Sequence, residues 1–330
     1  MNSKSSGRNA SAFRKAYWAF RQEGLPGAIK ALLPRNQLGD CIWLVWKYLA
    51  TFHRFPNLFS PKDYNEHVLW LMMSSDGRSK LRETINDKEL VKDYVRHKLG
   101  EGFTPKTLAI LRTRQAARDY NYPDTCVIKP THASGHVIIR KNGSPLDIEA
   151  IVACFDIDYS EILREANYRH LEPKVIVEAY LEEPGQETPR DYKVFCFSGR
   201  PAYIQVDTGR FSGHRRNMFS PNWRELDFGM IHPRCATSVA RPLNLEAMLA
   251  AAATLSADFS FIRVDFYHLD NSFHVGELTN FPGGATEGFT PESAGILAGR
   301  LFSDPTLDVE TLFGVYSETS QYKQPEQAHQ

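Results

Sequence analysis

Two acidic residues stand inside apolar segments, where strand cores usually carry valine or isoleucine. Asp265 lies within FIRVDFY, residues 261–267, and Glu277 lies within FHVGELT, residues 273–279. The polar stretch HLDNS between them favours a turn, so the two segments are predicted to pair as an antiparallel hairpin. Two carboxylates on neighbouring strands indicate electrostatic chemistry rather than simple packing.

Alternation along the two strands decides which side chains meet. Arg263, Asp265 and Tyr267 share one face of the first strand, and Glu277 and Thr279 share one face of the second. If these faces coincide, the carboxylates repel each other in a low-dielectric setting unless cations lie nearby. Mg²⁺ fits, because it prefers oxygen ligands and is typically held by one or two carboxylates together with substrate phosphates. The alternative is that the two acids belong to unrelated strand ends and point to solvent.

A second segment, VIKPTHASGHVII at 127–139, carries groups suited to phosphate binding. Lys129 ends an apolar strand and offers a positive charge, while Thr131 and Ser134 offer hydroxyl donors. Gly135 lets backbone N–H groups approach an anion closely. The alternative is a purely structural strand, turn and strand, which also occurs in proteins that bind no phosphate.

Basic residues gather in TGRFSGHRRNMF, residues 208–219. Arg210, His214, Arg215 and Arg216 form a local cluster suited to a carboxylate or phosphate group. The alternative is a solvated basic loop.

Composition limits the classes of function. The 330 residues contain 39 Lys and Arg against 39 Asp and Glu, so no net field attracts nucleic acid, and we expect no nucleic-acid partner. The five cysteines are odd in number and scattered, without the paired spacing of a zinc site. They are typical of reduced core residues in a cytoplasmic protein.

The N-terminal region is basic and rich in tryptophan. It lacks the continuous apolar segment of a signal peptide, and CIWLVWKYLATF at 41–52 is too short to span a bilayer and carries Lys47. Helices that pack on the body or on a partner chain are the preferred interpretation. A peripheral contact with the anionic inner face of a membrane is the alternative.

Helices and strands are predicted around these groups. Apolar spacing and capping signals predict helices at 60–75, 86–100, 146–155 and 243–257. Strands are predicted at both ends of 124–141, at 174–183, and in a hairpin formed by 191–199 and 200–209. The final residues, YKQPEQAHQ, have a composition typical of disorder.

The order of these segments resembles the ATP-grasp superfamily and, within it, the TupA-like family associated with teichuronopeptide and bacterial surface-polysaccharide biosynthesis. The resemblance extends from about Tyr64 to about Gly295. It rests on eight segments in the same order: YNEHVLWL, NDKELVKDYV, VIKPTHASGHVII, VIVEAYL, DYKVFCFSGRP, RRNMFSPNW, FIRVDFY and GELTNFPGG.

The resemblance implies an α+β, ATP-grasp fold in which two α+β lobes close on ATP, with a helical N-terminal extension. The implied units are a helical, basic and aromatic extension at 1–60, a helical region at 61–118, an N-lobe at 119–182, a C-lobe with the metal-binding strands at 183–310, and a C-terminal tail at 311–330.

The resemblance also implies a site for ATP. Lys129 contacts the phosphates, and a turn covers them with Thr131, His132, Ser134 and Gly135. A hinge on the adenine side contacts the base edge through its backbone and consists of Glu178, Ala179, Tyr180 and Leu181. Lys193 supplies a second cation, and Asp191 shares its strand face.

Asp265 and Glu277 are the implied ligands of Mg²⁺. Many ATP-grasp enzymes carry an asparagine two residues after the glutamate as a further metal ligand. Here that position is Thr279, and Asn280 lies one residue later on the opposite face. Thr279 is therefore the candidate third ligand, and the ligand set of a second metal ion stays open.

Most ATP-grasp enzymes phosphorylate a carboxylate and let an amine attack the acylphosphate, which yields an amide, ADP and phosphate. Arg263, which we expect to stabilise the oxyanion at the acyl carbon, and Arg210 are the catalytic candidates. An acidic acceptor is expected to bind Arg210, His214, Arg215 and Arg216, because their loop lies between two ATP-grasp strands.

The family context predicts the substrates: a uronic acid in a nucleotide-linked or lipid-linked glycan, and an amine or amino acid. A kinase that phosphorylates a glycan hydroxyl and an ATP-binding module without catalysis are the alternatives.

Overall fold

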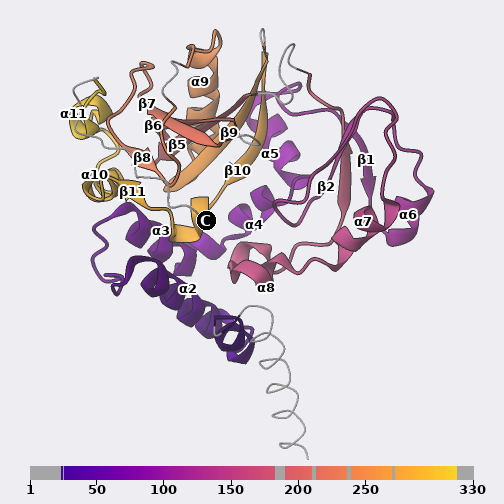
Figure 1. Ribbon diagram of the computed structural model, residues 1–330, viewed down its shortest axis with the longest axis horizontal. Helices are drawn as coiled ribbons and strands as arrows, with labels where there is room; N and C mark the ends of the chain where they lie inside the picture. Colours follow the sequence, from indigo (N-terminus) through magenta and orange to yellow (C-terminus); the bar gives the residue numbers. More distant parts are fainter. Residues whose placement is uncertain are drawn as a thin grey trace, which may run out of the picture.

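The chain forms two lobes, each built around an antiparallel sheet (Figure 1). The computed structural model describes Gly24 and residues 26–182, 190–209, 213–235, 239–269 and 272–317. The smaller sheet has four strands in the order β1-β4-β2-β3, and the larger has five in the order β10-β9-β5-β6-β7. An α+β fold with two lobes is therefore confirmed.

The smaller lobe packs two short helices on its sheet. Its elements are β1 (Thr107–Leu111), α6 (Arg114–Asp119), β2 (Cys126–Pro130), β3 (Ile138–Arg140), α7 (Ile148–Ala153) and β4 (Val175–Glu178). Ile128, Val175 and Ile151 belong to its separate apolar core. Because β1 pairs with β4, this sheet begins before residue 119. The helical region predicted at 61–118 therefore also contains one strand of this sheet.

The larger lobe contains the two predicted hairpins, and both are confirmed. Its elements are β5 (Arg190–Phe197), β6 (Arg200–Thr208), β7 (Arg215–Phe219), α9 (Leu245–Ser256), β9 (Phe261–Leu269) and β10 (Ser272–Thr279). Alternation gives β5 two apolar faces, since Val194 packs with α9 while Phe195 packs in the core below the sheet. Lys193 lies on the same face of β5 as Phe195, towards the polar N-terminal end of the strand.

Helices connect and cover the two sheets. They are α2 (Gln37–Phe52), α3 (Tyr64–Met73), η1 (Asp76–Arg78), α4 (Lys80–Asn86), α5 (Leu90–Leu99), η2 (Cys154–Asp156), α8 (Tyr159–Leu163), η3 (Ala166–Tyr168), η4 (Pro282–Ala285), α10 (Ser293–Arg300) and α11 (Val309–Phe313). A two-stranded pair consists of β8 (Gly229–Met230) and β11 (Phe289–Thr290). In Figure 1, α4 and α5 lie between the two sheets, so they hold the lobes together.

Helix α2 packs on the body of the protein. Trp43, Leu44 and Tyr48 are buried, and Asp40 pairs with Arg164 and Arg169 across the interface. These contacts agree with the packing interpretation of the N-terminal region. No helix within the described ranges is both long and apolar enough to cross a bilayer.

The C-terminal boundary also differs from the prediction. Helix α11 extends to Phe313, which is buried in the larger core, and Val315 bridges to Leu226. The predicted tail at 311–330 therefore begins later than expected. Its last residues, 318–330, lie outside the described part of the chain.

Candidate functional site

The carboxylates of the sequence pattern meet on one face of the larger sheet. Glu277 on β10 lies opposite Asp265 on β9, which in turn lies opposite Lys193 on β5. An irregularity in β10 between Val275 and Glu277 leaves Gly276 as an extra residue. The expected coincidence of the two faces is confirmed.

The bulge at Gly276 brings Glu277 onto this face. Val275 pairs with Phe266 on the apolar side, so strict alternation would put Glu277 on that side too. A Cβ atom at Gly276 would lie 2.8 Å from the ring of Tyr267, which explains the glycine at this position.

A buried ion pair occupies the middle of the site. Arg263 donates to both oxygens of Asp265, at 2.7 Å from Nε to Oδ1 and 2.7 Å from Nη2 to Oδ2. Lys193 Nζ lies 3.4 Å from Asp265 and also pairs with Asp191. Burial acts to raise the pKa of Asp265, and the charges of Arg263 and Lys193 act to lower it. Asp265 is thus bound by cations of the protein itself.

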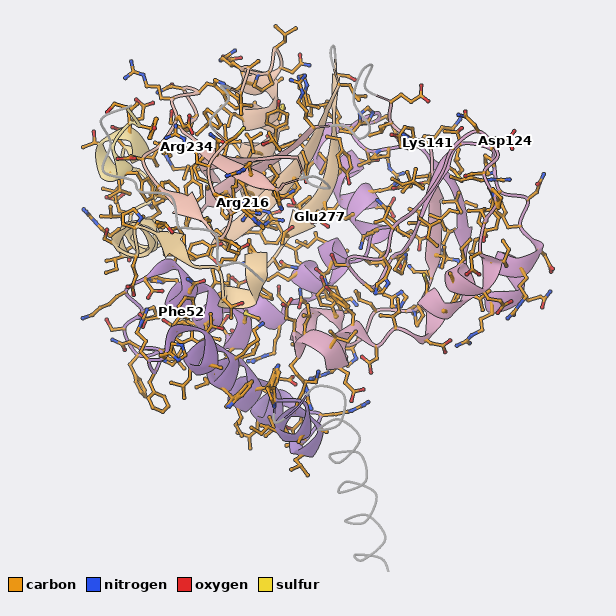
Figure 2. The ribbon with its side chains drawn as sticks, in the orientation of Figure 1. Phe52, Asp124, Lys141, Arg216, Arg234 and Glu277 are labelled. Atoms are coloured by element: carbon orange, nitrogen blue, oxygen red, sulfur yellow. The ribbon has the colours of Figure 1, made fainter. Side chains whose placement is uncertain are left out.

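Glu277 is the more accessible carboxylate. Its side chain is 43% exposed, accepts a hydrogen bond from Thr279 Oγ1 at 3.1 Å, and lies 3.8 Å from Arg263 Nη2. Burial acts to raise its pKa, but the charges of Lys88 and Arg263 hold the pKa of Glu277 at about 2. Figure 2 shows Glu277 on the side of the larger lobe that faces the smaller lobe.

In the smaller lobe, Lys129 is buried in an ion pair. Its Nζ lies 2.6 Å from Glu178 Oε2, and Lys92 Nζ lies 2.5 Å from Glu178 Oε1. Burial acts to lower the pKa of Lys129, but the charge of Glu178 outweighs it and the pKa is raised. Lys129 is therefore a stable cation next to the predicted hinge.

The hinge residues differ in what they offer to a ligand. The N–H of Ala179 donates to the carbonyl of Lys106 at 2.9 Å, so this donor is already used. Lys141 lies over the ring of Tyr180, 4.4 Å from its centroid, and Leu181 is partly exposed. Binding of adenine by the other backbone groups of this hinge stays a prediction.

Within the predicted phosphate turn, Thr131 and His132 point into the body of the protein. Thr131 is 0% exposed and donates to Asp87 at 3.0 Å, because that buried carboxylate needs donors. His132 is buried and accepts from the N–H of Lys174 at 3.4 Å. In this conformation neither side chain faces the site, contrary to the expectation for the turn.

Ser134 and Gly135 are the turn residues placed for a ligand. Ser134 lines the cavity described below. Gly135 has φ +86° and open space around the position of a Cβ atom. The turn is tied to the helices by Lys88, whose Nζ donates to the Ala133 carbonyl at 2.5 Å.

Lys88 is a site residue that sequence reasoning missed. It lines the same cavity as Glu277, and burial lowers its pKa to about 8. It stands in the short connection between α4 and α5, where a lysine looks like an ordinary surface residue. No spacing signal marks it.

The basic loop is largely paired within the larger lobe. Arg216 donates to Asp207 from Nε at 2.7 Å, and His214 Nε2 lies 3.3 Å from the same carboxylate. Burial acts to raise the pKa of Asp207, but Arg216 lowers it to about 2. Figure 2 shows Arg216 further across the lobe from Glu277. Arg215 is partly exposed, and Arg210 lies outside the described residues.

A cavity of about 290 Å³ is lined by the site groups that remain available to a ligand. Its lining includes the glycine turn of the smaller lobe, α4, α8, η3, β10 and one residue of α2. The charged and polar members are Lys47, Asn86, Lys88, Ser134, Tyr159, Glu165, Asn167, Tyr168, Arg263, Glu277, Thr279 and Asn280. Both lobes therefore face one polar space.

The donors at this cavity fit a magnesium ion in part. Carboxylate oxygens are suitable ligands, and Glu277 offers them to the cavity. Both oxygens of Asp265 are bound by Arg263, and Thr279 is bonded to Arg263 and Glu277. Within the described ranges no group of three or more acidic, histidine or cysteine side chains is poised to hold a metal.

The sequence matches the model of one protein family over residues 66–303, which is most of the chain. The family is described as TupA-like ATP-grasp. The chain belongs to the TupA-like ATP-grasp family. The resemblance recognised between about Tyr64 and Gly295 is thereby confirmed.

Solved structures of several ligases are similar to this member of the TupA-like family. D-alanine–D-alanine ligase from Bacillus anthracis, complexed with ATP, is 16% identical over 70% of this chain and 63% of that chain, with a TM-score of 0.37. The Helicobacter pylori D-alanine–D-alanine ligase is 19% identical over 71% and 61%, with a TM-score of 0.36. An L-amino acid ligase from Bacillus licheniformis is 10% identical over 76% and 56%, with a TM-score of 0.41.

The chain thus spans less than two thirds of the length of these three ligases. A search of the curated proteins found no match. The family assignment rests on the match over residues 66–303.

Proposed function

We propose that this protein is an ATP-dependent ligase that joins an amine to the carboxylate of a sugar acid. The observation that carries the proposal is the shared cavity, in which Ser134 of the smaller lobe faces Arg263 and Glu277 of the larger lobe. Phosphoryl transfer needs positioned cations and alignment more than covalent help from the protein. Lys88 and Lys129 supply cations on the side of the smaller lobe.

ATP binds with its phosphates near the glycine turn. Lys129 and Lys88 offset negative charge, and the open backbone at Gly135 allows close approach. Glu277 would hold Mg²⁺, and Asp265 would join it only if Arg263 released one of its oxygens. When bound, the metal neutralises developing charge on the transferred phosphoryl group.

The reaction proceeds in two steps. A carboxylate oxygen of the acceptor attacks the γ-phosphorus of ATP, the bond to the bridging oxygen breaks, and ADP leaves. The amine then attacks the acyl carbon, the bond from that carbon to the phosphate oxygen breaks, and inorganic phosphate leaves. Arg263, which lines the cavity, stabilises the negative charge on the acyl oxygen.

The family context supports a uronic acid as the acceptor, within a nucleotide-linked or lipid-linked glycan of a bacterial surface polysaccharide. We infer a cytoplasmic site of action, because activated sugars and ATP are both available there. A peripheral contact of the basic N-terminal region with the inner face of the membrane would bring the protein to a lipid-linked acceptor.

ADP release in the presence of Mg²⁺ tests the function directly. Free uronic acids, nucleotide-linked uronic acids and their reduced neutral sugars are each combined with a panel of amines. A ligase releases phosphate only when a uronic acid and an amine are both present, and mass spectrometry finds an amide. A stable phosphorylated sugar would identify a kinase, and ATP binding without turnover would identify a module without catalysis.

A further inference from the structure

One cation of the cavity comes from a helix that precedes the family-matched residues. Lys47 lies on α2, whereas the match to the family begins at residue 66. Its position is fixed because its neighbours Trp43, Leu44 and Tyr48 are buried against the body. Helix α2 therefore contributes to the lining of the site as well as covering the protein.

Lys47 faces Glu165 across a glycine. Gly284 has φ +56°, and a Cβ atom added to it would lie 2.7 Å from Lys47 Nζ and 3.3 Å from Glu165 Oε1. The absence of a side chain at Gly284 leaves room for both charged groups at the cavity wall. Among the described residues, neither group has an ion pair within 4.0 Å. A cation and an anion thus face the same space without being joined.

An unpartnered amide lies beside them. Asn167 is 1% exposed and lines the cavity, yet both its Oδ1 and its Nδ2 lack hydrogen-bond partners. Asn86 lines the cavity too, and its Nδ2 is likewise unpartnered. Buried polar atoms are almost always hydrogen-bonded, so such a group indicates a missing partner.

We propose that this end of the cavity binds the amine substrate as an α-amino acid, with Lys47 pairing with its carboxylate and Glu165 with its ammonium group. The proposal rests on the proposed function and specifies the class of amine. Opposite charges at two points recognise a zwitterion and discriminate against an amine that lacks the carboxylate, because Lys47 would then stay unpaired. Asn167 supplies a further donor and acceptor.

Glu165 is also positioned to accept a proton from the ammonium group of the amino acid. The ammonium group must lose one proton before its nitrogen can attack the acyl carbon, and Glu165 accepts it. The nitrogen lone pair then forms the amide bond, and phosphate leaves with the electrons of the broken carbon–oxygen bond and with the second proton of the nitrogen. Burial raises the pKa of Glu165 to about 7, with Lys47 opposing the shift, so the carboxyl group can accept and return a proton near neutrality.

The test compares alanine, glycine and glutamate with ethylamine and alaninamide as carboxylate-free probes, in the ligase assay with the full chain. We expect the parent to prefer the amino acids, and Lys47→Met to raise their KM by about tenfold to a hundredfold. The KM of ATP and the rates with ethylamine should change little. Lys80→Met is the control, because Lys80 is exposed and does not line the cavity.

Glu165→Gln should lower kcat for amino acids and reduce the increase of kcat with pH near neutrality. Glu165→Asp should restore part of kcat and part of its pH dependence. The proposal is overturned if the parent uses ethylamine and alanine equally, or if Lys47→Met weakens both classes of amine in parallel. The second result would instead place the acceptor carboxylate at Lys47.

A binding experiment separates this proposal from the ligase proposal. Calorimetry measures binding of the same amino acids and amines to the parent, Lys47→Met and Lys80→Met in the presence of a non-hydrolysable ATP analogue and Mg²⁺. If no amide forms with any acceptor but amino acids bind in a Lys47-dependent manner, the ligase proposal fails and the amino-acid site stands. If amides form from carboxylate-free amines alone, the ligase proposal stands and the amino-acid site is wrong.

Discussion

Replacing Asp265 by asparagine should unfold the protein more easily, even though it removes one charge from a pair of neighbouring carboxylates. The repulsion between two neighbouring carboxylates, as inferred from the sequence, predicts that neutralising either acid keeps or raises the stability of the metal-free protein. The structure reverses that expectation for Asp265, since both its oxygens bind the buried Arg263 at 2.7 Å. Asparagine keeps one acceptor but leaves the guanidinium without its counter-charge.

Removing one partner of a buried ion pair typically costs about 3–5 kcal/mol. Because asparagine retains one hydrogen bond and Lys193 lies 3.4 Å away, we expect the lower end, about 3 kcal/mol, for Asp265→Asn. Glu277→Gln is the matched comparison. Its side chain is 43% exposed and 3.8 Å from Arg263, so the cost should be below about 1 kcal/mol. Both substitutions should abolish turnover, because both remove charge from the site.

Thermal and urea unfolding in the absence of Mg²⁺ and ATP measure the two effects. The double variant Arg263→Met with Asp265→Asn should recover part of the stability lost by Asp265→Asn alone, because no unpaired charge then stays buried. If Asp265→Asn melts at the parental temperature, or the double variant is as unstable as the sum of the single ones, the ion pair is not the structural unit inferred here.

Three further outcomes are expected. Lys129→Ala should weaken ATP binding at least tenfold in calorimetry with Mg²⁺, and unchanged affinity would remove Lys129 from the nucleotide site. Asp207 has a pKa lowered to about 2, so it should contribute about 2 kcal/mol of stability that is present above about pH 4 and lost as the pH falls towards 2. Urea unfolding at pH 5 and pH 3 should therefore show a smaller pH dependence for Asp207→Asn, and an unchanged dependence would mean that Arg216 does not hold the carboxylate ionised. Gly276→Ala places a methyl group 2.8 Å from the Tyr267 ring, so it should lower both stability and turnover, and Tyr267→Ala should restore part of the stability.

Local patterns predicted the elements that carry the site. The hairpins of 191–209 and 261–279 follow from alternating apolar residues around short turns, and both are confirmed. The helix that ends at Gly100 follows from apolar spacing and from a glycine with φ +90°. Strand β1 was missed because Thr107–Leu111 is short and only partly buried, and it pairs with β4 more than sixty residues later.

The residues with misjudged surroundings have their partners on other segments of the chain. Thr131 looked like a free hydroxyl donor, but Asp87 takes its hydrogen bond. Arg216 looked like a free cation, but Asp207 neutralises it within the sheet. In both cases a buried carboxylate from another segment uses the donor, and no local pattern reveals that carboxylate.

The sequence by itself determined the family, the two hairpins and the set of residue types that a phosphoryl-transfer site needs, because strand alternation, turns and motif order are properties of neighbouring residues. Only the tertiary structure decided that Glu277 faces the cavity, since one bulged residue reverses the side of the sheet on which it lies. It also decided that Lys47 of α2 faces the same space as Glu165, more than a hundred residues later, beside Gly284. Sheet register and burial depend on which distant segments pack together, and those contacts fix which charges are paired and which remain available to a ligand.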